Sequence, residues 1–108
     1  MTDIPAIYQG EFKTLDQIKI SPLSRAYTFS DSIYEVIPYF SGKPLCFMEH
    51  IDRMKQSASL MDLDVNFKNA VDDIKELANT LTNKDGYVYY QISRGVDLVR
   101  SHLYQDDL

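Results

Sequence analysis

The hydrophobic period of this chain changes twice, and that change constrains the fold more than any other feature of the sequence. From Ser32 to Phe40 the run SIYEVIPYF is rich in β-branched and aromatic residues, which is typical of a strand. Between Ile51 and Leu81 apolar residues recur every three or four positions, as on one face of a helix. The run YVYYQISR, residues 87–94, has the composition of a strand again. This order of strand, helices and strand predicts an α+β domain.

Turn signals place the shorter elements. The first thirty residues are expected to form short strands broken by turns. The first strand is expected from Ile4 to Tyr8, followed by a turn at Gln9-Gly10 and an irregular piece through Ser21-Pro22. Ser41-Gly42-Lys43 predicts a turn, after which PLCFM, residues 44–48, is expected to return antiparallel as the second strand of a hairpin. The sheet is therefore expected to be mostly antiparallel.

Two helices are expected between the strands. The first has four apolar residues on one face: Ile51, Met54, Ala58 and Met61. The second has an apolar stripe at alternating steps of four and three: Phe67, Val71, Ile74, Ala78 and Leu81. In the strand that follows, one face carries Val88, Tyr90 and Ile92, and the other carries Tyr87, Tyr89 and Gln91. We interpret the helical stripes as core packing, so the fold class is α+β, a mostly antiparallel sheet with two helices packed on it.

Length and charge limit the classes of function. A chain of 108 residues with 44% hydrophobic and 25% charged residues is expected to form one domain, residues 1–108. Its net charge of −5 argues against a nucleic-acid partner, because such proteins usually present a basic face to the phosphates. The N-terminus lacks the basic start and apolar core of a signal peptide, and no apolar run is long enough to span a membrane. We therefore expect a cytoplasmic protein with no membrane partner.

Familiar short motifs do not identify a site. The single cysteine, Cys46, lies in an apolar run, and we interpret it as a buried thiol of a protein from a reducing compartment. The sequence contains no zinc-type spacing of His and Cys, no Gly-rich phosphate loop and no spacing typical of a Ser-His-Asp set. It predicts no metal site, and its candidate functional residues are dispersed: Tyr34, Arg53, Arg100 and His102.

The stretch RGVDLVRSHLY, residues 94–104, concentrates Arg94, Arg100 and His102 in an acidic chain, which suggests a negative group to hold. Arg100 and His102 are two positions apart, so in an extended segment their side chains project to the same side. There an Arg fork and a His donor could clasp one carboxylate. The alternative is a solvated loop whose charges pair with three nearby aspartates: Asp97, Asp106 and Asp107.

Arg53 lies near the start of the first expected helix, and its role stays open from the residues alone. It could reach a phosphate, because the N-terminal end of a helix favours a negative group. It could also form a surface ion pair with Glu49 or Asp52, which is the more common arrangement.

Several ordered segments carry a resemblance to a known family. The stretch from Arg25 to Leu63 contains the pattern Arg-x-x-x-Phe-x-Asp-x-x-Tyr-Glu, then a hairpin, then Glu-His-Ile-Asp-Arg opening a helix at Glu49. GYVYYQISRGV, residues 86–96, resembles the next strand of the same family with its Ser-Arg-Gly ending. With these segments in order, nearly the whole chain resembles the N-terminal small domain of the class IV aminotransferases, the fold-type IV pyridoxal-phosphate enzymes.

Within that family the Arg-x-His pair is most similar to the D-amino acid (D-alanine) aminotransferases. The resemblance implies that Tyr34, Arg100 and His102 bind the substrate α-carboxylate, with Arg100 and His102 reaching in from the other subunit of a homodimer. It implies that Arg53 binds the phosphate of pyridoxal 5′-phosphate. The implied reaction transfers an amino group from a D-amino acid to a 2-oxo acid.

The chain also departs from the family pattern. The family commonly has Gly-Asp-Gly where this chain has Ser30-Asp31-Ser32, in a turn that tolerates positive φ. The loop from Gly95 to Arg100 is one residue longer than in the D-alanine type and has Leu98-Val99 where a proline is usual, which could aim Arg100 differently. In the family, the lysine that forms the Schiff base lies in a second, larger C-terminal domain absent from this chain. The 108 residues alone are therefore expected to be inactive.

Alternatives stay open at this point. Branched-chain aminotransferase and aminodeoxychorismate lyase are siblings that have the same domain. A non-catalytic interaction module that kept the fold would have the same sequence pattern, and the serine-containing turn favours that interpretation. An unrelated acidic binding domain would remain only if the ordered match were chance.

Overall fold

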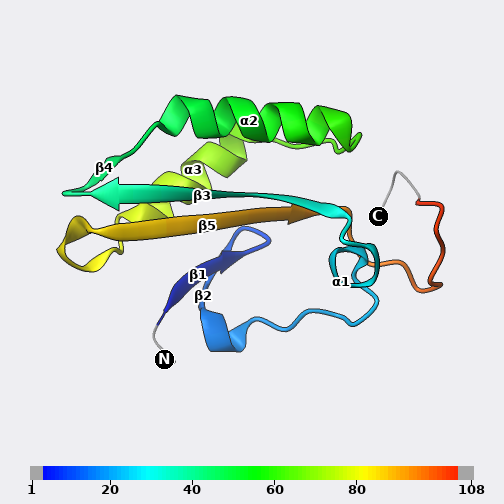
Figure 1. Cartoon of the computed structure of the whole chain (residues 1–108). Coiled ribbons are helices and arrows are strands. Elements are labelled where there is room, and N and C mark those ends of the chain that lie inside the picture. Colours follow the sequence, from blue (N-terminus) through cyan, green and yellow to red (C-terminus); the bar gives the residue numbers. More distant parts are fainter. Residues whose placement is uncertain (1–3, 105–108) are drawn as a thin grey trace.

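The fold follows the predicted order of elements, with a short helix added before the long strand (Figure 1). The computed structural model describes residues 4–104. Its elements are β1 (Pro5–Tyr8), β2 (Glu11–Thr14), the 3-10 helix η1 (Leu15–Gln17), α1 (Arg25–Phe29), β3 (Ser32–Phe40), β4 (Lys43–Pro44), α2 (Phe47–Leu60), α3 (Phe67–Ala78), η2 (Thr82–Lys84) and β5 (Gly86–Ser93). Strands β1 and β2 form one antiparallel sheet, and a second antiparallel sheet has the order β4-β3-β5. The predicted α+β class is confirmed.

The ladder between β3 and β5 separates two different faces. It pairs residues 32–39 with residues 86–93, so alternate side chains point to opposite sides of the sheet. One face contributes buried residues: Ile33, Ile37, Tyr39 and Val88. The other face carries exposed ones: Tyr34, Val36, Phe40, Tyr87 and Tyr89. The predicted division of the last strand into two faces is therefore confirmed, and the face with Val88 lies towards the core.

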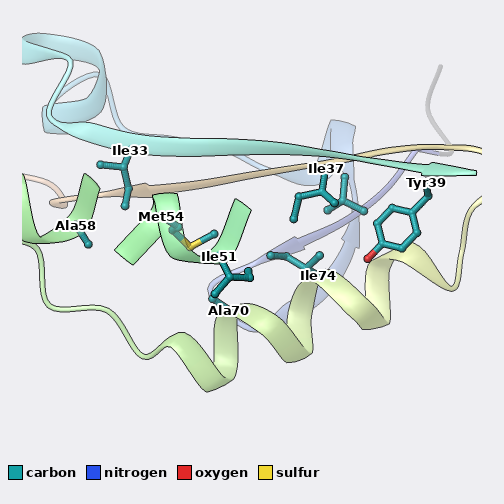
Figure 2. Packing of buried hydrophobic residues seen from close by; sticks show 9 residues of the cluster. Ile33, Ile37, Tyr39, Ile51, Met54, Ala58, Ala70 and Ile74 are labelled. Carbon is teal, nitrogen blue, oxygen red and sulfur yellow. The ribbon is translucent and has the colours of Figure 1, made fainter. Parts of the chain in front are cut away.

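The core lies between the sheet and helices α2 and α3. Figure 2 shows Ile37 of β3 pointing towards the helices, where Met54 of α2 and Ile74 of α3 lie. These three are the largest fully buried side chains, and each stabilises the fold by about 1.5–3 kcal/mol. Three residues of the predicted first stripe are buried in α2 (Ile51, Met54 and Ala58), while the fourth, Met61, is half-buried just past the end of the helix. In α3 the buried positions are Ala70, outside the predicted stripe, and Ile74. None of the helices within residues 4–104 has the length and apolar character needed to cross a bilayer.

Helix α1 corrects the prediction for the first thirty residues. The sequence RAYTF has no helical apolar period, and the helix is only five residues long. It ends at Ser30, which has φ 53° and ψ 33° in the left-handed region. For a residue other than glycine this conformation costs about 1–2 kcal/mol. The departure from Gly-Asp-Gly therefore places Ser30 at a strained position, while the second serine, Ser32, is extended as the first residue of β3.

The predicted antiparallel hairpin is confirmed, because β3 pairs with β4 through Tyr39–Pro44 and Phe40–Lys43, but the return strand is much shorter than the predicted PLCFM. Strand β4 consists only of Lys43–Pro44, because Cys46 adopts φ 53° and the chain enters α2 at Phe47. Cys46 is exposed, so the prediction of a buried thiol is wrong. Its position at the bend between sheet and helix keeps the side chain off the core face.

Candidate functional site

A buried ion cluster of Arg25, Asp31 and Arg94 ties the start of β3 to the end of β5. Asp31 Oδ2 accepts hydrogen bonds from Arg25 Nε at 2.9 Å and from Arg94 Nε at 2.8 Å. The three residues are 3%, 7% and 8% exposed, in chain order. Backbone hydrogen bonds join the same residues, from Asp31 N to Arg25 O and from Arg94 N to Asp31 O. One carboxylate thus fixes two arginines from distant parts of the chain.

Internal contacts occupy Arg94. Its guanidinium donates to the backbone carbonyls of Met61 and Asp62, and the centroid of the Tyr104 ring lies 3.7 Å from its Cζ. The negative group that Arg94 holds is Asp31 of its own chain. The expectation that Arg94 helps to hold an external anion is therefore wrong, and the residue is structural.

Asp31 stays charged inside this cluster. Burial by itself raises the pKa of Asp31, but the hydrogen bonds from Arg94 and Arg25 outweigh burial, and the pKa is lowered. The carboxylate therefore remains available to both arginines at neutral pH.

Arg100 and His102 contact the same aromatic ring. Arg100 Cζ lies 4.4 Å from the centroid of Phe29 in α1. The His102 and Phe29 centroids are 5.1 Å apart, with the rings at 61°. A cavity of about 380 Å³ lies beside them, with Phe29, His102 and the two arginines of the ion cluster among its lining residues. The structure brings the predicted pair together, while carboxylate binding by it stays a prediction.

For the alternative of a loop with paired surface charges, the described residues include one of the three aspartates, Asp97. Asp97 Oδ1 accepts a hydrogen bond from the backbone N of Val99 at 3.2 Å. In the described part of the chain no ion pair joins Arg100 to an acidic residue. Asp106 and Asp107 lie outside the described residues.

Arg53 forms an ion pair with a residue of the sheet. Arg53 Nε and Nη2 donate to Glu35 Oε2 and Oε1 at 2.8 and 2.7 Å, and His50 Nδ1 lies 2.7 Å from Glu35 Oε1. The expected ion pair with Glu49 or Asp52 is therefore wrong, because Arg53 reaches from α2 to β3. The Glu35 side chain is 2% exposed, whereas that of Arg53 is 64% exposed. We call Glu35, His50 and Arg53 the strand–helix cluster.

Arg53 keeps donor capacity for an anion. Glu35 engages its Nε and Nη2, and among residues 4–104 no hydrogen-bond acceptor lies at Nη1. The pKa of Arg53 is raised, mainly by the hydrogen bond with Glu35 and with a smaller electrostatic effect from Tyr34. A permanently charged guanidinium, held on one side and open to solvent on the other, fits a phosphate group such as that of pyridoxal phosphate.

Tyr34 lies on the open face of the sheet, next to Glu35 along β3. Its ring stacks on Tyr89 of β5, with centroids 5.8 Å apart and an interplanar angle of 19°. Within the described ranges no hydrogen bond or ring contact joins Tyr34 to Arg100 or His102. Within a single chain the four predicted residues therefore lie in three places: Arg53 in the strand–helix cluster, Tyr34 on the outer face of the sheet, and Arg100 with His102 at α1.

The residues that hold Arg53 and the Arg-x-His pair in place were not among the predicted site residues: Arg25, Phe29, Asp31, Glu35 and His50. All five lie in the segment, residues 25–63, that resembles the family, and this resemblance was the sequence signal that could have identified them. Glu35 gave a second signal, because a charged residue within the apolar run SIYEVIPYF needs a buried partner.

Comparison with known proteins identifies the family of the chain. The family described as amino-transferase class IV matches residues 32–105, which include all four predicted site residues. The chain belongs to this family. It is 37% identical over 87 residues to a D-alanine aminotransferase of Listeria monocytogenes, covering 77% of this chain and 29% of that protein. It is 36% identical over 89 residues to a D-alanine aminotransferase of Staphylococcus haemolyticus, covering 81% of this chain and 32% of that protein. The chain thus spans less than a third of the length of these relatives.

Acid is expected to destabilise the protein through Glu35. The hydrogen bond from Arg53 lowers the pKa of Glu35 more than burial raises it, and His50 lowers it further. Such a carboxyl contributes stability that is fully present above its unfolded pKa of 4.5 and is lost as pH falls through the lower folded value. We expect the free energy of unfolding in urea to fall between about pH 5 and about pH 3. Glu35→Gln should flatten this slope.

The exposed Glu76 of α3 provides the control for this measurement. Glu76→Gln should keep the acid slope of the wild-type protein. If Glu35→Gln kept it as well, the strand–helix cluster would not be a source of the pH dependence.

Proposed function

We propose that the intact protein is a pyridoxal-phosphate-dependent aminotransferase that moves an amino group from a D-amino acid, such as D-alanine, to a 2-oxo acid. Residues 1–108 supply the small N-terminal domain, and a larger C-terminal domain carries the lysine that holds the cofactor. The observation that carries this proposal is the pairing of Arg100 and His102 on one ring. The names of the relatives, D-alanine aminotransferases, support the same reaction.

The substrate carboxylate would lie between Arg100, His102 and Tyr34. The planar guanidinium of Arg100 offers two parallel donors to the two carboxylate oxygens, and the hydroxyl of Tyr34 offers another. Holding the carboxylate in this way orients the Cα–H bond for removal of its proton. Tyr34 stacks on Tyr89 and, among the described residues, does not contact the Arg-x-His pair of its own chain. This separation supports a homodimer. In that dimer, Arg100 and His102 of a second copy complete the site around Tyr34.

The cofactor phosphate would bind Arg53 through the donors that Glu35 leaves available. When bound, pyridoxal phosphate supplies a ring that delocalises negative charge from the substrate Cα. No lysine of this chain has a covalent role in the proposal, so the 108 residues alone should be inactive. The net charge of −5 supports an enzyme that acts on small molecules and has no nucleic-acid partner, and a cytoplasmic location is part of the proposal.

The visible absorption spectrum of the native gene product, recorded before and after addition of D-alanine, tests this proposal. A cofactor band that changes with D-alanine but not with L-leucine is the expected result. A band that responds only to L-leucine would indicate a branched-chain aminotransferase, and a response only to aminodeoxychorismate would indicate the lyase. A protein with no cofactor band would favour the non-catalytic module.

A further inference from the structure

The loop that carries Arg100 and His102 is attached to α1 at both ends. At its start, Arg25 N donates to Gly95 O at 2.7 Å. At its end, Arg25 Nη1 donates at 2.6 Å to the carbonyl of Ser101, the residue between Arg100 and His102. Figure 1 shows α1 and this segment side by side at one end of the sheet. One buried arginine therefore fixes the backbone beside both members of the pair.

Phe29 gives the two side chains a common support. The Cζ atoms of Arg25 and Arg100 lie 4.6 and 4.4 Å from its ring centroid, and the His102 ring meets it at 61°. A guanidinium that packs on an aromatic face keeps its in-plane N–H donors available for a ligand. Phe29 thus restrains Arg100 without using the donors that a carboxylate needs.

The part of this loop that differs from the D-alanine type, Leu98-Val99, lies between Gly95 and Ser101, the two residues that hydrogen-bond to Arg25. Leu98 and Val99, at the position where the loop departs from the D-alanine type, are 84% and 70% exposed. The attachments at Gly95 and Ser101 lie on either side of them. The residues that differ therefore extend into solvent, and Arg25 still holds the backbone at Ser101 through its hydrogen bond.

We infer that Arg25 and Phe29 are positioning residues that hold Arg100 and His102 in the orientation in which the pair binds a substrate carboxylate. This inference rests on the proposed function. An arginine on an unsupported loop would lose rotamer freedom on binding, and a preformed arrangement avoids that loss. Arg25 and Phe29 act through the pair, so removing their support should raise KM much more than it lowers kcat.

Proton NMR of this chain tests the support without cofactor or substrate. The chain has two histidines, so His102→Gln assigns the ring protons of His102 and leaves those of His50. Phe29→Leu should move the His102 resonances towards those of free histidine, because the nearby aromatic ring is gone. Phe29→Tyr keeps the ring and should leave them in place. Tyr27→Leu, an 80% exposed aromatic residue of the same helix, is the matched control. Unmoved His102 resonances in Phe29→Leu would overturn the inference.

Steady-state kinetics of the intact protein test the consequence for binding. Phe29→Leu should raise the KM for D-alanine roughly three- to tenfold, with kcat and cofactor affinity close to wild type, and Phe29→Tyr should restore the KM. Arg100→Ala separates the proposed carboxylate-binding role of the pair from the positioning role of Phe29. If Arg100→Ala leaves KM unchanged, the proposed role of the pair is wrong. If Arg100→Ala raises KM and Phe29→Leu does not, the pair binds substrate but the positioning inference fails.

Discussion

Asp31→Ala is expected to lower the free energy of unfolding by about 3–5 kcal/mol. The substitution leaves the buried guanidinium groups of Arg25 and Arg94 without the carboxylate that both contact. A domain of this kind is stable by only about 5–15 kcal/mol, so the variant should be marginally folded. Urea unfolding followed by far-UV circular dichroism measures the loss.

Two further variants test whether the lower free energy of unfolding comes from the lost charge of Asp31. Asp31→Asn keeps the shape of the side chain and removes its charge, so it should also be clearly destabilised. Asp64→Ala removes an exposed carboxylate between α2 and α3 and should change stability by less than about 0.5 kcal/mol. If Asp31→Ala remained within about 1 kcal/mol of wild type, the ion cluster would not be a main support of this end of the sheet.

The two charged clusters differ in how much of the arginine side chain they leave in contact with solvent. In the ion cluster both arginines are buried, and they donate to a carboxylate and to backbone carbonyls of the same chain. In the strand–helix cluster the carboxylate of Glu35 is buried but the guanidinium of Arg53 is largely in solvent. A buried arginine has its charge satisfied internally, whereas Arg53 is held on one side and can meet a ligand on the other.

The parts of the fold that the sequence predicted are those where apolar residues keep one period. Strands β3 and β5 alternate and α2 repeats every three to four residues, so their faces follow from local sequence. Helix α1 has no such period, and its ends are bonded to distant residues: Arg25 N donates to Gly95 O, and Arg94 is tied to Asp31 just past Ser30. The length of β4 could not be predicted from the sequence either, because the strand is cut short by a left-handed conformation at Cys46.

The sequence alone indicated Arg100, His102 and Arg53 as candidates, but their roles and the residues that hold them depended on the family resemblance. Arg53 and its partner Glu35 are 18 residues apart, and Arg25 and its acceptor Ser101 are 76 apart. No local spacing encodes such pairs. The composition of residues 94–104 did indicate a charged segment, but it could not show that Arg94 is used internally while Arg100 is exposed.

Arg100→Ala in the intact protein is expected to raise the KM for D-alanine by on the order of 100-fold. A two-point, charge-assisted contact with the carboxylate is lost, and each 1.4 kcal/mol of lost binding is about a factor of ten. Arg100 is exposed and packs on Phe29, so the free energy of unfolding should fall by no more than about 1 kcal/mol. Initial rates over a range of D-alanine concentrations give the KM, and the cofactor absorption band reports on cofactor binding.

Arg100→Lys shows whether the geometry of the guanidinium matters beyond its charge. Lysine keeps the positive charge but lacks the planar fork, so its KM should fall between those of wild type and Arg100→Ala. An alkyl amine without a carboxylate should be used equally poorly by all three proteins, because the lost contact is specific to the carboxylate. If the KM for D-alanine were the same in all three, the carboxylate would be bound elsewhere and Arg100 would be a surface cation packed on Phe29.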